Sequence, residues 1–255
     1  MNKKQIALTL YTIRNFCQTE KDLVKSLQKV KNIGYSAIQV SSIGPINPRI
    51  VKNICDDLEL LICATHEPNE LIINNTNKII EKLNIFDCIY TALPYPLNVN
   101  LNSIKEIDLF IKKIDKAGSI MKESGKVLCY HNHAIEFKKI ENETILERIY
   151  RKTNHHNVQG EPDIFWIQKG GHNPIDWCIH LNNRLPLIHL KDFVINENDE
   201  GFYAELGQGN LNIPRIIFEA ENSGCKWFIV EQDECNKDPF EAIKISYKYL
   251  NLLSK

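Results

Sequence analysis

The sequence comprises 255 residues, in which 31 lysines and arginines stand against 32 aspartates and glutamates, so the formal net charge is −1 with neutral histidine. This balance argues against a protein that binds nucleic acid or an anionic membrane through charge, because both partners require a cationic surplus. A content of 43% hydrophobic and 25% charged residues is ordinary for a soluble globular protein and excludes a disordered or fibrous chain. Chains of about 250 residues often form one barrel of alternating strands and helices.

The sequence shows neither a targeting pattern nor a disulfide pattern. No run of about 18 apolar residues occurs, and the apolar run near the N-terminus is too short and too interrupted for a signal peptide. We therefore expect a cytoplasmic protein. The eight cysteines include no C-x-x-C pair and, in a chain of this length, do not indicate a disulfide scaffold.

Short β-rich runs alternate with helical patterns along the whole chain. The predicted strands are Ile6–Leu10, Ala37–Val40, Leu60–Ala64, Cys88–Ala92, Val127–Tyr130, Val158–Asp163, Leu187–Leu190 and Phe228–Glu231. The predicted helices are Glu20–Lys31, Arg49–Leu58, Ile73–Leu83, Ile104–Met121, Ile145–Arg151, Pro174–Asn182, Pro214–Ser223 and Asp238–Leu252. This alternation predicts an α/β fold, a (β/α)8 TIM barrel in one domain over residues 1–255. An open doubly wound sheet is the alternative, because periodicity alone does not show closure.

Polar residues stand at the carboxyl ends of several predicted strands, where barrels carry their chemistry. In HLKD (189–192), the alternation along a strand places His189 and Lys191 on the same inward face. Glu231 ends the apolar run WFIV, and Asp233 follows two residues later. A buried carboxylate there requires a cation, a metal or hydrogen-bond donors. Asp163 ends the sixth strand, where an aspartate before a helix is more often an N-cap than a ligand.

The fifth predicted strand ends in YHNH (130–133), followed by Glu136. His131 and His133 share one face of the strand, and imidazole with carboxylate is a common ligand set for a divalent ion. The segment GQGN (207–210) lacks the lysine and serine of a P-loop, so it predicts a tight loop, with Asn210 or Asn212 capping the next helix. Four aromatic residues could form an apolar wall for a sugar ring: Tyr11, Phe165, Trp166 and Phe202.

One histidine with three carboxylates is a mostly oxygen ligand set, which suits Mn²⁺, Mg²⁺, Co²⁺ or Zn²⁺ and leaves positions for substrate oxygens. An ion held there could bind a carbonyl and its neighbouring hydroxyl together and lower the cost of an enediolate. A carboxylate beside the bound carbon could then remove and return a proton, as isomerisation or epimerisation requires. The same enolate could instead expel a β-substituent, so the spacing leaves both outcomes open.

Six segments, in this order along the chain, resemble the sugar phosphate isomerase/epimerase family, the xylose-isomerase-like barrels. They are YHNHAIEF, EPDIFWIQKGGHNPIDW, LPLIHLKDF, LGQGNLN, WFIVEQDE and the closing SYKYL. The resemblance spans nearly the whole chain and is strongest from residue 125 onward. It implies a (β/α)8 barrel with one divalent metal ion that acts on sugars, keto-sugars, inositol derivatives or related polyols.

The resemblance also implies a ligand set. Asp163, His189 and Glu231 match the family's metal ligands on the sixth, seventh and eighth strands. Many relatives have a glutamate within the fifth strand, where this chain has Cys129, so the predicted fourth ligand is Glu136.

Catalytic and substrate-binding roles follow from the same resemblance. Glu231 is the predicted general base, opposed by Glu136 or by a histidine of the fifth strand, here His131. The predicted substrate-binding residues are His66, His133, Trp166, Lys191 and Asp233. The predicted cofactor is one divalent ion of Mn, Co, Mg or Zn, and the predicted partner is a small-molecule sugar or sugar derivative.

Several alternatives stay open. Epimerase relatives have a histidine three residues after the sixth-strand aspartate, where this chain has Trp166, so a keto-sugar or inosose isomerase, a lyase or a dehydratase is as compatible as a ketose 3-epimerase. The superfamily also contains endonucleases that cut abasic sites with three metals, but this chain has no cationic surplus for DNA. A sugar-binding barrel without catalysis is a third possibility. We expect neither nucleic acid nor membrane as a partner, and a homo-oligomer stays open.

Overall fold

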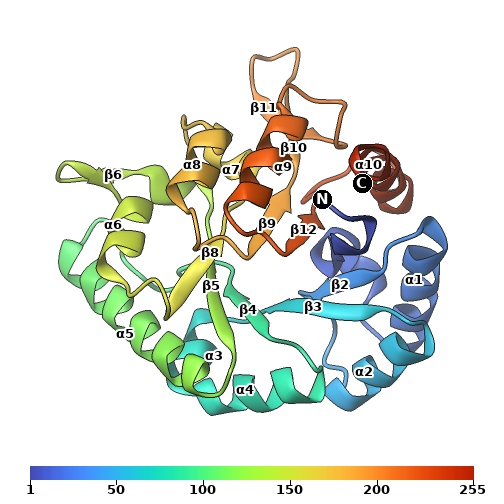
Figure 1. Ribbon diagram of the computed structural model, residues 1–255, viewed down its shortest axis with the longest axis horizontal. Coiled ribbons are helices and arrows are strands. Elements are labelled where there is room, and N and C mark those ends of the chain that lie inside the picture. The colour runs from blue at the N-terminus through green and yellow to red at the C-terminus, as the bar shows by residue number, and fades with distance from the viewer.

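Eight parallel strands form the centre of the protein, for which a computed structural model describes residues 1–255. They are β1 (Ile6–Thr9), β2 (Ala37–Val40), β3 (Leu61–His66), β4 (Tyr90–Leu93), β5 (Val127–His131), β8 (Val158–Glu161), β9 (Leu187–Leu190) and β12 (Trp227–Val230). Their order in the sheet is β8-β5-β4-β3-β2-β1-β12-β9. Because the first strand pairs with the last, the sheet curls into a nearly closed (β/α)8 barrel, and the open doubly wound alternative is wrong (Figure 1).

Helices surround the sheet (Figure 1). They are α1 (Glu20–Ile33), α2 (Pro48–Asp57), α3 (Asn69–Asn74), α4 (Thr76–Ile85), α5 (Ile104–Glu123), α6 (Ile145–Lys152), α7 (Ile164–Lys169), α8 (Pro174–His180), α9 (Ile213–Asn222) and α10 (Pro239–Leu253). Three short 3-10 helices, η1 (Lys3–Gln5), η2 (Leu10–Phe16) and η3 (Ala134–Phe137), complete the helical part. The eight predicted strands are all present, with ends displaced by one or two residues.

Three parts of the helix and strand prediction need correction. The predicted helix Ile73–Leu83 is two helices, because Asn75 between α3 and α4 has φ −140° and ψ 44°, outside the helical region. The six-residue α7 was not predicted, since it is too short to show a helical period. Two antiparallel hairpins were also missed, β6 (Lys139–Ile140) with β7 (Glu143–Thr144) and β10 (Asp192–Ile195) with β11 (Gly201–Ala204).

The inside of the barrel is layered because side chains two residues apart on a strand point the same way. A small cluster inside the barrel consists mainly of small apolar residues. Two residues further along six of the eight strands the buried side chain is polar, in the pairs Ala7/Thr9, Ala37/Gln39, Cys63/Thr65, Cys129/His131, Leu187/His189 and Ile229/Glu231. The larger apolar cluster lies between the sheet and the helices. The polar layer therefore collects at the carboxyl end of the barrel.

The barrel closes least firmly between β8 and β9. Every other adjacent pair of strands shares at least three registered positions, whereas β8 and β9 meet through one isolated bridge between Asp163 and His189. In that bridge the His189 backbone N–H donates to Pro162 O at 3.0 Å. The seam of the barrel thus coincides with two of the predicted metal ligands.

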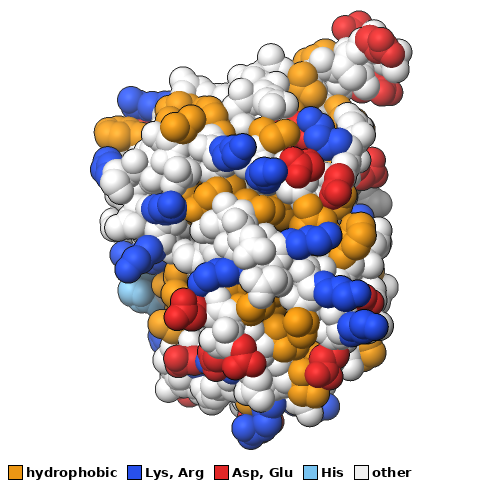
Figure 2. Space-filling model, turned by 90° about the vertical axis from the view of Figure 1, so that its right-hand side faces the viewer, with side chains coloured by type: hydrophobic (Ala, Val, Ile, Leu, Met, Phe, Trp, Pro, Cys, Tyr) orange, Lys and Arg blue, Asp and Glu red, His pale blue; other side chains and the backbone are white.

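The outer surface carries mixed charge. On the face shown in Figure 2, lysines and arginines are dispersed among acidic, hydrophobic and other side chains. No helix combines the length and the apolar character that crossing a membrane requires.

The packing of α5 against the loop before β8 gives a first prediction. A Cβ added at Gly118 would lie 2.0 Å from the backbone oxygen of Asn157. Replacing a glycine by alanine in an exposed helix raises the free energy of unfolding by up to about 1 kcal/mol. Here we expect Gly118→Ala to lower the free energy of unfolding by about 1–3 kcal/mol, because the two backbones must separate. Urea unfolding measures the change. Ser119→Ala is the matched control, expected to shift the value by under about 0.5 kcal/mol, and a Gly118→Ala protein as stable as wild type would contradict this packing.

Candidate active site

Four ligand-type side chains converge at the seam of the barrel. His131, Asp163, His189 and Glu231 are all buried, and one ligand atom from each lies within 4.8 Å of the others. Two of them belong to β5 and β9, Glu231 directly follows β12, and Asp163 lies two residues after the end of β8, so parallel strands deliver all four to one end of the barrel. Three of the four predicted metal ligands are therefore brought together, with His131 as the fourth member. We call these four residues the ligand cluster.

Glu136 lies outside the ligand cluster. Its Oε1 accepts a hydrogen bond from the Tyr130 hydroxyl and its Oε2 accepts one from the His133 backbone N–H, both at 2.9 Å. Burial raises the pKa of Glu136 to about 7. These two hydrogen bonds hold the YHNH segment in place, because η3 turns the Glu136 side chain back toward the end of β5.

The two carboxylate oxygens of Asp163 have different surroundings. Its Oδ1 accepts hydrogen bonds from the backbone N–H groups of Phe165 and Trp166, at 3.0 and 3.2 Å, and so caps α7. Its Oδ2 is buried and accepts no hydrogen bond of suitable direction. The cap fixes the side chain, and the second oxygen is left facing the ligand cluster.

Negative charge exceeds positive charge around the ligand cluster. The Lys191 ammonium lies 2.9 Å from Asp163 Oδ2, 2.7 Å from Glu231 Oε2 and 2.5 Å from Asp233 Oδ2. Burial lowers the pKa of Lys191, but the three carboxylates outweigh burial and raise it well above its usual value. One ammonium cannot neutralise three carboxylates, and an uncompensated buried charge is costly. This charge excess fits a divalent cation.

A second group of possible ligands overlaps the ligand cluster. It consists of His66, His131, Glu161 and His189, again within 4.8 Å. Glu161 Oε2 is 2.6 Å from His66 Nε2. Burial disfavours the ionised form of Glu161, but His189 and His66 lower its pKa to about 2. From the sequence alone Glu161 had no assigned role, although its spacing of two residues from Asp163 places both on one face.

Gln39 orients the histidine that the two groups share. Its amide donates to Glu161 Oε1 at 2.7 Å, and its carbonyl oxygen is 2.8 Å from His189 Nε2. The His189 Nδ1 is 2.8 Å from Glu231 Oε2. His189 therefore donates from both ring nitrogens, to Gln39 and to the Glu231 carboxylate, because burial lowers its pKa but Glu161 and Glu231 outweigh burial and raise it to about 10. A metal ion at the ligand cluster would take the place of the proton on Nδ1.

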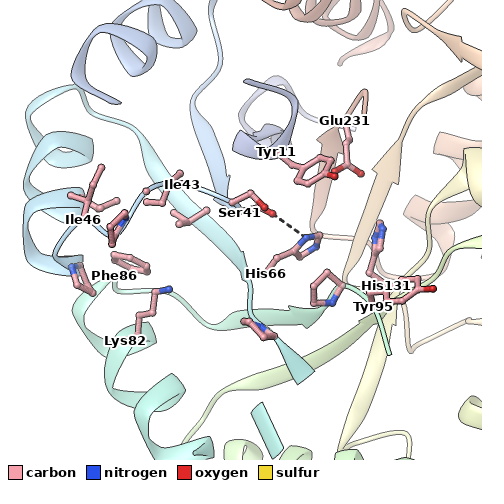
Figure 3. Close-up of a pocket in the computed structure, with 18 of the residues that line it drawn as sticks. Tyr11, Ser41, Ile43, Ile46, His66, Lys82, Phe86, Tyr95, His131 and Glu231 are labelled. Atoms are coloured by element: carbon pink, nitrogen blue, oxygen red, sulfur yellow. Dashed lines mark hydrogen bonds between the residues drawn. The ribbon is translucent and has the colours of Figure 1, made fainter. Parts of the chain in front are cut away.

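A cavity of about 690 Å³ opens onto the ligand cluster and exposes His131 and Glu231 to it (Figure 3). Of the predicted substrate-binding residues, His66, His133 and Asp233 line the cavity. Lys191 does not line the cavity and lies among the carboxylates. Trp166 does not line it either, and its ring is 5.1 Å from that of His133 and 5.4 Å from the Lys191 ammonium.

The remaining sequence predictions at this end of the barrel have mixed outcomes. Of the four aromatic residues, only Tyr11 lines the cavity, whereas Phe165 is buried and stacks on Tyr203 at 4.3 Å. The GQGN segment is a tight loop as predicted, because the N–H groups of Gly207 and Gly209, together with that of Leu211 just after the segment, donate to the carboxylate of Asp192. Asn212 caps α9 by accepting from the Arg215 N–H.

Comparison with known proteins bears on both the fold and the family. A sugar phosphate isomerase/epimerase from Parabacteroides distasonis ATCC 8503 is 20% identical, with a TM-score of 0.84 over 97% of this chain and 98% of that one. An L-ribulose 3-epimerase is 13% identical, with a TM-score of 0.75 over 99% and 94% of the two chains. A xylose isomerase-like TIM barrel protein from Mycobacterium smegmatis, solved in complex with magnesium, is 12% identical, with a TM-score of 0.77 over 99% and 98%.

At these identities the solved structures establish a shared fold. No curated protein matches the sequence. The family model described as xylose isomerase-like TIM barrel matches residues 27–252. Since this match covers most of the sequence, the chain belongs to the xylose isomerase-like TIM barrel family.

Proposed function

We propose that this protein is a divalent-metal-dependent enzyme that isomerises or epimerises a sugar by moving a proton next to a carbonyl. The observation that carries the proposal is the ligand cluster, which lies buried at the carboxyl end of the barrel and opens into a ligand-sized cavity. Structural similarity to an L-ribulose 3-epimerase and to a magnesium-bound family member supports it.

His131, Asp163, His189 and Glu231 would hold the ion, which would be Mn²⁺, Co²⁺, Mg²⁺ or Zn²⁺ for this ligand set. When bound, the ion supplies a Lewis acid for the negative charge that develops on the sugar oxygens. We place His131 rather than Glu136 in the fourth position, because both oxygens of Glu136 are hydrogen-bonded elsewhere.

Glu231 is the proposed general base. It lines the cavity, and although burial raises its pKa, Lys191 and His189 lower that pKa well below the usual value, so the carboxylate is ionised. His133 lines the same cavity as a neutral imidazole, because burial lowers its pKa to about 3. A neutral imidazole can orient a sugar hydroxyl by hydrogen bonding without adding charge.

The reaction subclass follows from how many proton carriers the cavity offers. A single base that removes and returns a proton on one face suffices for isomerisation, whereas epimerisation requires a second carrier on the opposite face. Trp166 stands where the epimerase relatives have a histidine, and an indole does not transfer protons in this way. His133 and Asp233 nevertheless line the cavity beside Glu231 as other groups able to carry a proton, so isomerisation and epimerisation stand as equally compatible. A lyase or dehydratase is the second candidate, because expulsion of a β-substituent needs only one base.

Metal content tests the ligand assignment. We expect about one divalent ion per purified chain by elemental mass spectrometry, and an affinity reduced by about tenfold or more in His131→Ala and His189→Ala. Glu136→Gln should keep the ion, and His155→Ala, at an exposed position, is the matched control. Loss of the ion in Glu136→Gln with retention in His131→Ala would reverse the assignment of the fourth ligand.

Solvent exchange tests the chemistry. Incubated in D₂O with a panel of keto-sugars and aldoses, the protein should introduce deuterium next to the carbonyl of its substrate, as read by NMR and mass spectrometry. Glu231→Gln should reduce exchange by about 10²-fold or more, whereas Glu123→Gln on the exposed face of α5 should not. A product with a new double bond would identify a lyase. A metal-loaded protein that binds sugars but exchanges no proton would instead be a binding barrel.

The pH dependence of stability tests the buried state of Glu136. Between its ordinary value of 4.5 and about 7, the unfolded chain ionises this carboxyl while the folded protein keeps it protonated. Its contribution to stability is therefore complete below pH 4.5 and is lost as the pH rises to about 7. With a chelator present, wild type should lose about 2 kcal/mol more than Glu136→Gln between pH 5 and pH 8 in urea unfolding. Glu123→Gln should retain the wild-type profile, and parallel profiles for wild type and Glu136→Gln would show that Glu136 is ionised in the fold.

A further inference from the structure

The cavity has two chemically different ends. Glu231, His66 and His131 lie at the end that meets the ligand cluster, while Ile43, Ile46 and Phe86 lie at the other (Figure 3). The second end belongs to the same cavity, so a molecule bound at the ligand cluster can extend into it. We call it the apolar end.

The apolar end is built from segments that the ligand cluster does not use. The loop after β2 supplies Ile43 and Ile46, and Phe86 follows directly after α4. Phe86 is 2% exposed, so its ring is held by packing, and both isoleucines pack against the main core. Ser41 joins the two ends, because its hydroxyl is 3.3 Å from His66 Nδ1. A preformed apolar surface therefore continues from the polar end without a break.

The charges in the cavity do not favour a phosphate. Lys82 is the only lysine in the lining and no arginine lines it. The Lys82 ammonium lies 2.6 Å from Oε1 of Glu67, whose side chain is 4% exposed, so its charge is already paired. Phosphate recognition in proteins commonly uses an arginine or an unpaired lysine, and the side chains that line the cavity supply neither.

We propose that the substrate is an unphosphorylated sugar that carries an apolar substituent of about the size of a phenyl ring, with the sugar at the ligand cluster and the substituent against Ile43, Ile46 and Phe86. The position of the sugar rests on the proposed function. The cavity has room for both parts, since its volume of about 690 Å³ is more than twice the lower limit of about 300 Å³ for ligand pockets.

Calorimetric titration with matched glycosides tests this inference. The probes are the phenyl glycoside, the methyl glycoside and the 1-phosphate of glucose, galactose and xylose, each titrated into the metal-loaded wild-type protein. At least one phenyl glycoside should bind about tenfold or more tightly than its methyl counterpart, because burying a ring removes apolar surface from water. The corresponding 1-phosphate should bind no more tightly than the methyl glycoside.

Two substitutions localise the effect. Ile46→Asp should reduce the phenyl advantage to about threefold or less while leaving the affinity for the methyl glycoside unchanged. Ile50→Asp is the matched control, because Ile50 is also half-buried and packed against the core but does not line the cavity, and it should retain the full advantage. If Ile46→Asp does not fold, the affinities of the wild-type protein for the phenyl, methyl and phosphate derivatives still test the inference.

Equal affinity for phenyl and methyl glycosides, tighter binding of the 1-phosphate, or no binding of any phenyl glycoside at millimolar concentration would overturn the inference. These outcomes are separable from the proposed function. Proton exchange on free sugars without a phenyl advantage would retain the enzyme and reject the apolar substituent. Tighter binding of a phenyl glycoside by a protein that exchanges no proton would retain the apolar substituent and reject the enzyme.

Discussion

Three carboxylates gathered around one buried ammonium are the constraint on which the carboxyl end of the barrel depends. Lys191 is 1% exposed, and Asp163, Glu231 and Asp233 all lie within 2.9 Å of its nitrogen. Such a group is tolerated in a protein interior only when positive charge and hydrogen bonds surround it. The neighbouring histidines, the cap that holds Asp163 and the amide of Gln39 meet this requirement, and the same arrangement leaves ligand atoms directed at one point.

The two halves of the chain contribute differently to the site. All members of the ligand cluster come from residues 131–231, whereas the apolar end of the cavity comes from residues 43–86. The sequence motifs that resemble the family also lie in the second half. Loops of the other half can therefore change the shape of the cavity without disturbing the ligand cluster.

Much of the fold and several residues of the site could be predicted from the sequence, because side chains alternate strictly between the two faces of a strand. His189 and Lys191 face inward as the spacing of two requires, and both are buried. Asp163 was predicted as either a cap or a ligand, and spacing could not reveal that one of its oxygens caps α7 while the other faces the ligand cluster. Such a division appears only once the helix it caps is placed in three dimensions.

Contacts across the barrel were beyond the reach of the sequence. The position of Glu136 is local instead, because η3 begins with a capping box in which the Glu136 side chain accepts from the His133 N–H three residues earlier. The sequence prediction missed this box because its first residue is a histidine and not the usual serine or threonine. Glu161 and Gln39 lie 122 residues apart in the sequence but share a hydrogen bond. Pairings of this kind arise from closure of the sheet, which periodicity does not describe.

The seam between β8 and β9 bears on association between chains, because open strand edges can pair with strands of other molecules. Beside the single bridge, Arg184 occupies the edge of β8: its carbonyl oxygen accepts from the Gly160 N–H at 2.7 Å, and its Nε donates to Val158 O at 2.9 Å. Pro162 directly follows β8 and Pro186 directly precedes β9, and proline has no N–H to offer to another strand. The arginine and the two prolines therefore leave few backbone groups at the seam for edge-to-edge pairing.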